Sequence, residues 1–186
     1  MARERRAAIL VVDDNPNKLL ALEAVLGPLG QRVECAGSGR EALRRLLKDD
    51  FAVILLDVRM TEMDGFETAA MIRQRRRSER TPIIFVTAFG QAEADMERGF
   101  ALGAVDFVFS PISPDVLRNK VSVFVDLYRK SEEVRRQGDR LRRLEADEHR
   151  RRLAQAESGR RQAEARFATM LDIAGDAIIA LDDDGR

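Results

Sequence analysis

Five short apolar runs constrain the fold of this chain more than any other feature. They cover residues 7–13, 32–36, 51–57, 82–88 and 104–109, and each is bounded by Gly, Asp, Ser or Pro. Unbroken apolar runs of this length are typical of strands that are buried on both faces, as in a parallel sheet covered by helices. Amphipathic stretches separate the runs. The pattern therefore predicts five β–α repeats that build an open, doubly wound α/β sheet.

Capping signals mark where the intervening helices should begin. Asn15 followed by Pro16 is typical of an N-cap with proline at the first helical position. Ser38, with Glu41 three residues later, predicts a capping box. Glycines stand where the first and fourth helices should end, at Gly27, Gly30 and Gly103.

Composition narrows the class of protein. The chain carries 32 Lys and Arg residues against 32 Asp and Glu residues, so its balanced charge gives no electrostatic case for a nucleic-acid partner. The single cysteine, Cys35, excludes an internal disulfide and a cysteine-based zinc site. No apolar run approaches the roughly 18 residues that a membrane helix needs. We therefore expect a soluble, cytoplasmic chain without a membrane partner.

After Pro114 the pattern changes to one long helix. Proline is absent from residues 115–171, which are dense in Arg, Glu and Ala. The apolar residues thin to a stripe in which Leu127, Val134 and Leu141 keep a spacing of seven. Leu144 and Leu153 follow nine residues apart, so the register shifts there. A single helix cannot bury so narrow a stripe, so residues 129–171 are predicted to continue the fifth helix as a two-stranded coiled coil in a homodimer. A solvated, partly frayed linker helix is the alternative.

Candidate site residues follow the predicted strands. They are Asp13 and Asp14 after the first strand, Asp57 after the third, Thr87 after the fourth and Ser110 after the fifth. Ligands of open α/β sheets bind beyond the carboxyl ends of the strands. Three carboxylates gathered there repel one another unless a cation lies between them, and an incomplete set of oxygen ligands suits Mg²⁺. The alternative is that these carboxylates only cap the following helices.

The same residues suggest a reaction. A carboxylate that contacts a metal ion and lies beside a hydroxyl group can act as a nucleophile toward phosphorus. The product of such an attack is an aspartyl phosphate.

Four stretches resemble the receiver domain of bacterial two-component response regulators. They are VVDDNPNKLLALEAVL, VILLDVRMTEMDGFETAAMIR, PIIFVTAFG and GAVDFVFSPI, and they agree with that family in order and spacing. The resemblance implies a receiver domain over residues 1–128 with the flavodoxin-like strand order 2-1-3-4-5. It also implies that Asp57 accepts a phosphoryl group from a histidine kinase or a phosphotransfer protein.

The resemblance implies roles for the other candidates. Asp13, Asp14, Asp57 and the backbone carbonyl of Arg59 would hold Mg²⁺. Thr87 would bond to a phosphoryl oxygen, and Phe107 would be the aromatic residue that moves inward with Thr87.

Two departures from the family pattern affect this expectation. Receivers carry lysine before the proline of the fifth strand, whereas Ser110 precedes Pro111 here, and a hydroxyl cannot replace a unit charge. Thr61 replaces the usual proline four residues after the acceptor. We hypothesise that the guanidinium of Arg59 partly supplies the missing charge, with an Arg59 side chain that points to solvent as the alternative. The loss of lysine also keeps open a pseudo-receiver, a constitutive dimerisation or docking module.

The last residues resemble the opening of a PAS sensory domain. Residues 172–186 are expected to be a truncated start of that domain, in which a strand and an acidic turn follow the signalling helix. Without partner strands, this stretch could also extend the helix, fray or pair with another chain. The chain contains no kinase histidine motif and no nucleotide-binding glycine loop. We therefore expect these residues to be a phosphoacceptor and not an enzyme. A further alternative is that the parent chain is an enzyme, such as a histidine kinase or a diguanylate cyclase, whose output would lie beyond Arg186.

Overall fold

A computed structural model describes residues 6–88 and 92–183. The strands are β1 (Ala8–Val12), β2 (Arg32–Ala36), β3 (Val53–Asp57), β4 (Ile83–Ala88) and β5 (Asp106–Ser110). The helices are α1 (Pro16–Leu26), α2 (Gly39–Lys48), α3 (Gly65–Arg73), α4 (Ala92–Ala101) and α5 (Pro114–Asp183), with a 3₁₀ turn at Gly27–Leu29. Strands and helices alternate through β5, as the five apolar runs predicted.

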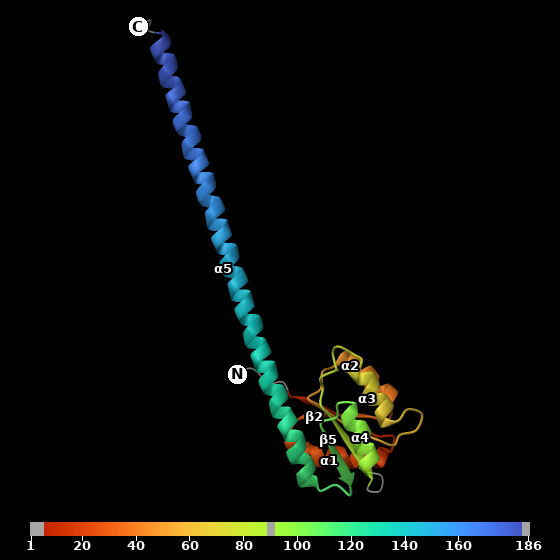
Figure 1. Cartoon of the computed structure of the whole chain (residues 1–186). Coiled ribbons are helices and arrows are strands. Elements are labelled where there is room, and N and C mark those ends of the chain that lie inside the picture. The colour runs from red at the N-terminus through yellow and green to blue at the C-terminus, as the bar shows by residue number, and fades with distance from the viewer. Residues whose placement is uncertain (1–5, 89–91, 184–186) are drawn as a thin grey trace. The chain divides into compact units, whose positions relative to one another are not determined.

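The five strands form one parallel sheet in the order β2-β1-β3-β4-β5. Figure 1 labels the two edge strands of this sheet, β2 and β5. Val12 pairs with Leu56 between β1 and β3, and Asp57 pairs with Val86 between β3 and β4. This register places the carboxyl ends of the three central strands side by side. The predicted doubly wound sheet and its strand order are confirmed.

Helices bury both faces of the sheet. On one face, Leu43 of α2 and Phe66 of α3 pack in a cluster that also contains Phe85 of β4. On the other face, Leu26 of α1 and Leu117 of α5 pack against the opposite side of the strands. Because successive strand residues point to opposite faces, both faces require apolar side chains. This is the reason that the central strands β1, β3 and β4 are apolar up to their carboxyl ends. The edge strand β2 contains Arg32 and Glu34 and is only partly buried, so the prediction of burial on both faces is wrong for this strand.

The helix caps agree with the sequence in part. The Ser38 hydroxyl accepts a hydrogen bond from the Glu41 amide (3.2 Å), as predicted, but the Glu41 carboxylate accepts from the Gly37 amide (2.8 Å) rather than from Ser38. The predicted capping box is therefore shifted by one residue on its return side. A complete capping box, which the sequence pattern did not reveal, joins Asp64 and Glu67 at the start of α3.

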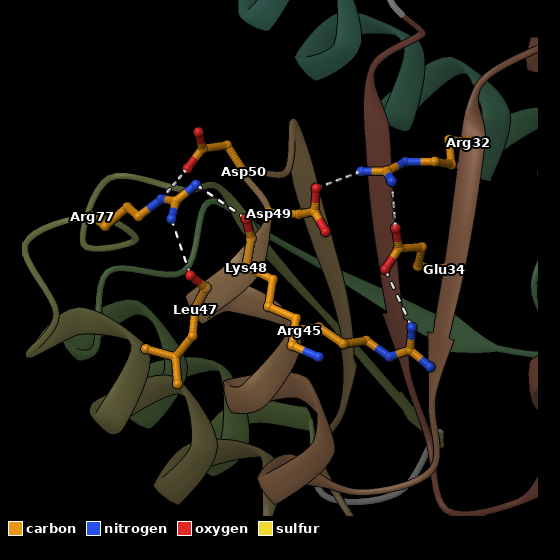
Figure 2. A network of polar contacts seen from close by, with 8 residues as sticks. All are labelled: Arg32, Glu34, Arg45, Leu47, Lys48, Asp49, Asp50 and Arg77. Carbon is orange, nitrogen blue, oxygen red and sulfur yellow. Dashed lines mark hydrogen bonds and ion pairs between the residues drawn. The ribbon is translucent and has the colours of Figure 1, made fainter.

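A network of polar contacts binds α2 to its neighbours. Figure 2 shows its members: Arg32, Glu34, Arg45, Leu47, Lys48, Asp49, Asp50 and Arg77. Arg77, in the loop after α3, donates to the Asp50 carboxylate (2.7 Å) and to the Leu47 carbonyl (3.0 Å). Helix ends expose carbonyls with partial negative charge, so a guanidinium is well suited to this position. The network fixes the end of α2 at the edge of the domain opposite the predicted site.

The helix α5 runs without a break from Pro114 to Asp183, which confirms the helix predicted for residues 129–171. The strand expected in the last residues is wrong, because residues 178–181 are helical. A strand needs a neighbouring strand for its hydrogen bonds, whereas a helix forms them within its own segment. Residues 184–186 lie outside the described residues.

Contacts divide the chain into residues 1–132 and 133–186. Among the described residues, no helix combines the length and apolarity needed to cross a membrane.

Candidate functional site

Three carboxylates meet at the carboxyl edge of the sheet. Asp13 directly follows β1, Asp14 is the next residue, and Asp57 ends β3. One oxygen from each lies within 4.8 Å of the others, and no other group of three acidic, His or Cys side chains this compact occurs in the part of the chain that the structure describes. Asp13 and Asp57 are buried. Carboxylate oxygens in this arrangement are typical of a Mg²⁺ site, as the strand ends predicted.

Backbone amides orient the two aspartates that follow β1. The Asn15 amide donates to Asp13 Oδ1 (2.8 Å), and the Thr61 amide donates to Asp14 Oδ2 (2.7 Å). The hydrogen bond from Thr61 is the main reason that the pKa of Asp14 lies below its ordinary value, although burial opposes it. A proline at position 61 would have no amide hydrogen to donate. The departure at Thr61 therefore supplies a contact to the acidic cluster.

Lys18 joins two of the carboxylates, and the sequence pattern did not identify it. Asn15 caps α1 as predicted, with Pro16 at the first helical position, so Lys18 lies on the first turn. Its Nζ is 3.2 Å from Asp13 Oδ2 and 3.1 Å from Asp57 Oδ2. Burial lowers the pKa of Lys18, but the hydrogen bonds and charges of Asp57 and Asp13 outweigh it and leave the pKa raised. Lys18 is therefore a charged ammonium group inside the acidic cluster.

Asp57 lies in an environment that raises the pKa of its carboxyl group. Burial raises its pKa above the ordinary value, and the negative charge of Asp13 adds to this effect. The hydrogen bond and charge of Lys18, with a backbone hydrogen bond at Arg59, act in the opposite direction without cancelling the shift. The raised pKa means that the ionised form of Asp57 is disfavoured, and a cation beside this carboxylate would stabilise that form.

Thr87 and Phe107 lie on adjacent strands. Thr87 is buried on β4, and its Oγ1 has no hydrogen-bond partner among the described residues. The Phe107 ring is buried on β5, with its centroid 5.2 Å from that of Phe85 and 5.3 Å from that of Phe100. Gly99 of α4 makes room for this ring, since a Cβ there would lie 2.3 Å from a Phe107 ring carbon. Phe107 is therefore inside the core rather than at the acidic cluster.

The two remaining candidates, Ser110 and Arg59, line different cavities. Ser110 ends β5 and lines a cavity of about 210 Å³ together with Lys18 and Val86. Arg59 is exposed and lines a second cavity, of about 470 Å³, with Asp14. The ion pair with Asp57 is made by Lys18 on the Ser110 side, and a contribution of Arg59 to the charge of the site stays a prediction.

Residues 9–122 match the family described as "Response regulator receiver domain". The chain belongs to this family. The chain is 30% identical to the receiver domain of the sensor histidine kinase PA1611 from Pseudomonas aeruginosa PAO1, whose structure has a magnesium ion coordinated in the active-site cleft. That likeness has a TM-score of 0.60 and covers 65% of this chain and 98% of the other. The receiver is also similar to the Vibrio cholerae chemotaxis protein CheY4, with 31% identity, a TM-score of 0.60, and coverage of 64% and 98%.

Longer curated proteins share the same region. A probable cyclic di-GMP phosphodiesterase of Vibrio cholerae serotype O1 is 35% identical over 136 residues, which is 73% of this chain and 30% of that protein. The signal transduction histidine-protein kinase BarA of Escherichia coli K12 is 35% identical over 111 residues, which is 60% of this chain and 12% of that protein. The chain therefore spans less than a third of the length of either protein.

Proposed function

We propose that this receiver accepts a phosphoryl group on Asp57 in a Mg²⁺-dependent reaction, with a histidine kinase or a phosphotransfer protein as donor. The observation that carries the proposal is the placement of three carboxylates within 4.8 Å of one another, with Thr87 on the adjacent strand. Asp13, Asp14, Asp57 and the carbonyl of Arg59 are the proposed metal ligands. The ion would neutralise charge on the transferred group while its oxygens are held in place.

The chain's own residues suggest how the transfer proceeds. An oxygen of Asp57 forms a bond to phosphorus while the bond from phosphorus to the donor's leaving atom breaks. The buried Thr87 hydroxyl then donates a hydrogen bond to a phosphoryl oxygen, a role that agrees with its lack of another partner among the described residues. Movement of Thr87 would free or fill space near Phe107, which packs against Gly99 of α4.

The signal is proposed to leave the domain along α5 through a homodimeric coiled coil. Large apolar side chains on this helix are more than half exposed: Leu127, Val134, Leu141, Leu144, Leu153, Phe167 and Met170. Leu127, Val134 and Leu141 keep a spacing of seven, which a second copy of the helix would cover. The output is proposed to lie in a further region of a longer protein, and the greater length of the curated relatives supports this. That region would carry the output activity, with a histidine kinase or a cyclase as the alternatives.

A pseudo-receiver is the second candidate function. Ser110, in place of the lysine of the family pattern, favours a domain that docks or dimerises without phosphorylation. Mg²⁺ binding does not distinguish the two functions, because both retain the acidic cluster. Phosphotransfer does.

The deciding experiment is incubation with Mg²⁺ and acetyl phosphate, followed by intact-mass measurement. We expect the mass of one phosphoryl group to be added to the protein and not to the Asp57→Ala variant. If the protein gains no phosphoryl group and also fails to bind beryllofluoride, the phosphoacceptor proposal is wrong and the docking module is favoured.

A further inference from the structure

The acidic cluster needs a positive charge beyond that of a divalent cation. Asp13, Asp14 and Asp57 carry three negative charges when ionised, and a phosphoryl group on Asp57 would replace one carboxylate charge with about two. Ser110, at the end of β5, offers only a hydroxyl group. A basic side chain that reaches the oxygens of Asp57 would therefore favour the phosphorylated form.

Lys18 has the geometry for this role. Its ammonium group is 3.1 Å from Asp57 Oδ2, and its side chain lines the same cavity as Ser110. The side chain is 50% exposed, so its flexible stem can follow an oxygen that moves outward when phosphorus is added. The backbone beneath it is fixed, because Asn15 caps α1 and Pro16 and Lys18 both lie on the first turn of this helix.

Neither Lys120 nor Arg59 lines the cavity that Lys18 shares with Ser110. Lys120 of α5 pairs with Asp106 at the start of β5. Arg59 lines the cavity on the Asp14 side, whereas Lys18 and Ser110 share the other cavity. The ion pairs of Lys18 with Asp13 and Asp57 place its charge where a phosphoryl group on Asp57 would extend.

We propose that Lys18 binds the phosphoryl group on Asp57 and supplies, from α1, the charge that Ser110 does not supply from β5. The proposal rests on the proposed phosphoacceptor function. No bond to Lys18 forms or breaks; its ammonium donates hydrogen bonds to phosphoryl oxygens and remains protonated. The competing model is that Lys18 only occupies the place of the metal ion and hinders Mg²⁺.

The two models differ at saturating Mg²⁺. A side chain that only competes with the metal has no effect once the metal is bound, whereas a phosphoryl ligand is still required. We therefore compare the wild-type protein with Lys18→Met, which keeps most of the stem and removes the charge. Lys48→Met removes a lysine that is exposed at the far end of α2 and is the matched control.

Three quantities are measured for each protein: the affinity for Mg²⁺ by calorimetry, the affinity for beryllofluoride by fluorine NMR, and the rate of phosphorylation by acetyl phosphate from intact mass. At saturating Mg²⁺ we expect Lys18→Met to lower the beryllofluoride affinity and the rate by about tenfold or more, the scale of a lost charge-assisted hydrogen bond. Lys48→Met should leave all three unchanged.

A relocated charge provides the second arm. In Lys18→Met/Ser110→Lys, a lysine enters the shared cavity from β5, and we expect it to restore most of the lost beryllofluoride affinity. Equal rates for Lys18→Met and wild type at saturating Mg²⁺, or faster phosphorylation of the variant, would overturn the role of Lys18 and leave the phosphoacceptor function standing. A wild-type protein that neither phosphorylates nor binds beryllofluoride would overturn both.

Discussion

Asp57 combines burial with a negative neighbour, and both raise its pKa. A carboxyl group whose pKa is higher in the folded state than in the unfolded chain destabilises the fold once it ionises. The stability of the metal-free protein should therefore fall as the pH rises from the ordinary pKa of aspartate through the raised pKa of Asp57. Below both values the penalty is absent, because the group is protonated in both states.

Asp57→Asn removes this titration and should be more stable than wild type at neutral pH, by on the order of 1 kcal/mol. The difference should shrink as the pH falls through the raised pKa. Urea unfolding of both proteins in chelator, at a series of pH values, measures it. A variant that is less stable than wild type at neutral pH would mean that the Lys18 ion pair outweighs the cost of burial.

Much of the residue-level site was predictable, because parallel strands end at the same edge of a sheet. Asp13, Asp14 and Asp57 were located by this rule, and Thr87 was placed on the adjacent strand. Lys18 was not, since its contact with Asp57 depends on how α1 lies across the sheet and on the conformation of a long side chain. A weaker signal was present: a lysine four residues after Asp14, on the first turn of a helix that begins at the site.

Between elements, Arg73 joins the end of α3 to two loops. Its guanidinium donates to four backbone carbonyls, those of Glu79, Thr81, Leu102 and Gly103. Arg73→Lys retains a charge but cannot reach four acceptors, so it should destabilise the receiver by about 1.5–3 kcal/mol. Chemical denaturation provides the measurement, with the exposed Arg76→Lys as control. Equal loss in the two variants would show that these hydrogen bonds add little net stability.

Two glycines in helices give opposite predictions. Alanine stabilises a helix interior relative to glycine by about 1 kcal/mol, and a Cβ added at Gly138 of α5 would meet no neighbouring side chain within 4 Å. Gly138→Ala should therefore raise helix content. Gly99→Ala should instead destabilise the receiver by about 1–3 kcal/mol, because its Cβ would overlap the Phe107 ring. Thermal unfolding followed by circular dichroism compares them, and a stabilising Gly99→Ala would show that the ring moves freely.

Helix boundaries were more predictable than contacts between helices. Asn15 and Ser38 cap α1 and α2 as expected, since a cap depends on residues near it in sequence. Gly99 of α4 contacts Phe107 of β5, and no pattern in the sequence around either residue predicts this contact. Glu41 lies between these cases, because its bond to Gly37 instead of Ser38 depends on the path of the preceding loop.

For the whole molecule, the exposed stripe on α5 predicts association between two chains. Val134 and Leu141 are 68% and 60% exposed, although both are large apolar residues. Val134→Asp/Leu141→Asp should convert the proposed dimer to a monomer, because each carboxylate would have to be buried in the seam. Sedimentation equilibrium measures the mass. Leu47→Asp, at a 61% exposed position on α2, is the control, and an unchanged dimer in the double variant would locate the interface elsewhere.

The long helix followed from the absence of proline and the narrow apolar stripe, but its extent did not. Residues 178–181 have an apolar sequence that suits a strand, but they are helical. The sequence could not reveal this, because the periodicity of four residues does not distinguish a helix from a strand. A strand at these residues would need a neighbouring strand to accept and donate its backbone hydrogen bonds.

The exposed stripe has a consequence for the dependence on concentration. Residues 1–132 contain both apolar clusters of the sheet, so their folding is unimolecular and independent of dilution. In the proposed homodimer, the stripe from Val134 to Met170 would become buried only on association with a second chain, so its burial would follow mass action. At low copy number the receiver could therefore be phosphorylated while α5 was unpaired and could not transmit the conformational change. The abundance of the protein, and not the phosphodonor alone, would then set the fraction of molecules able to respond.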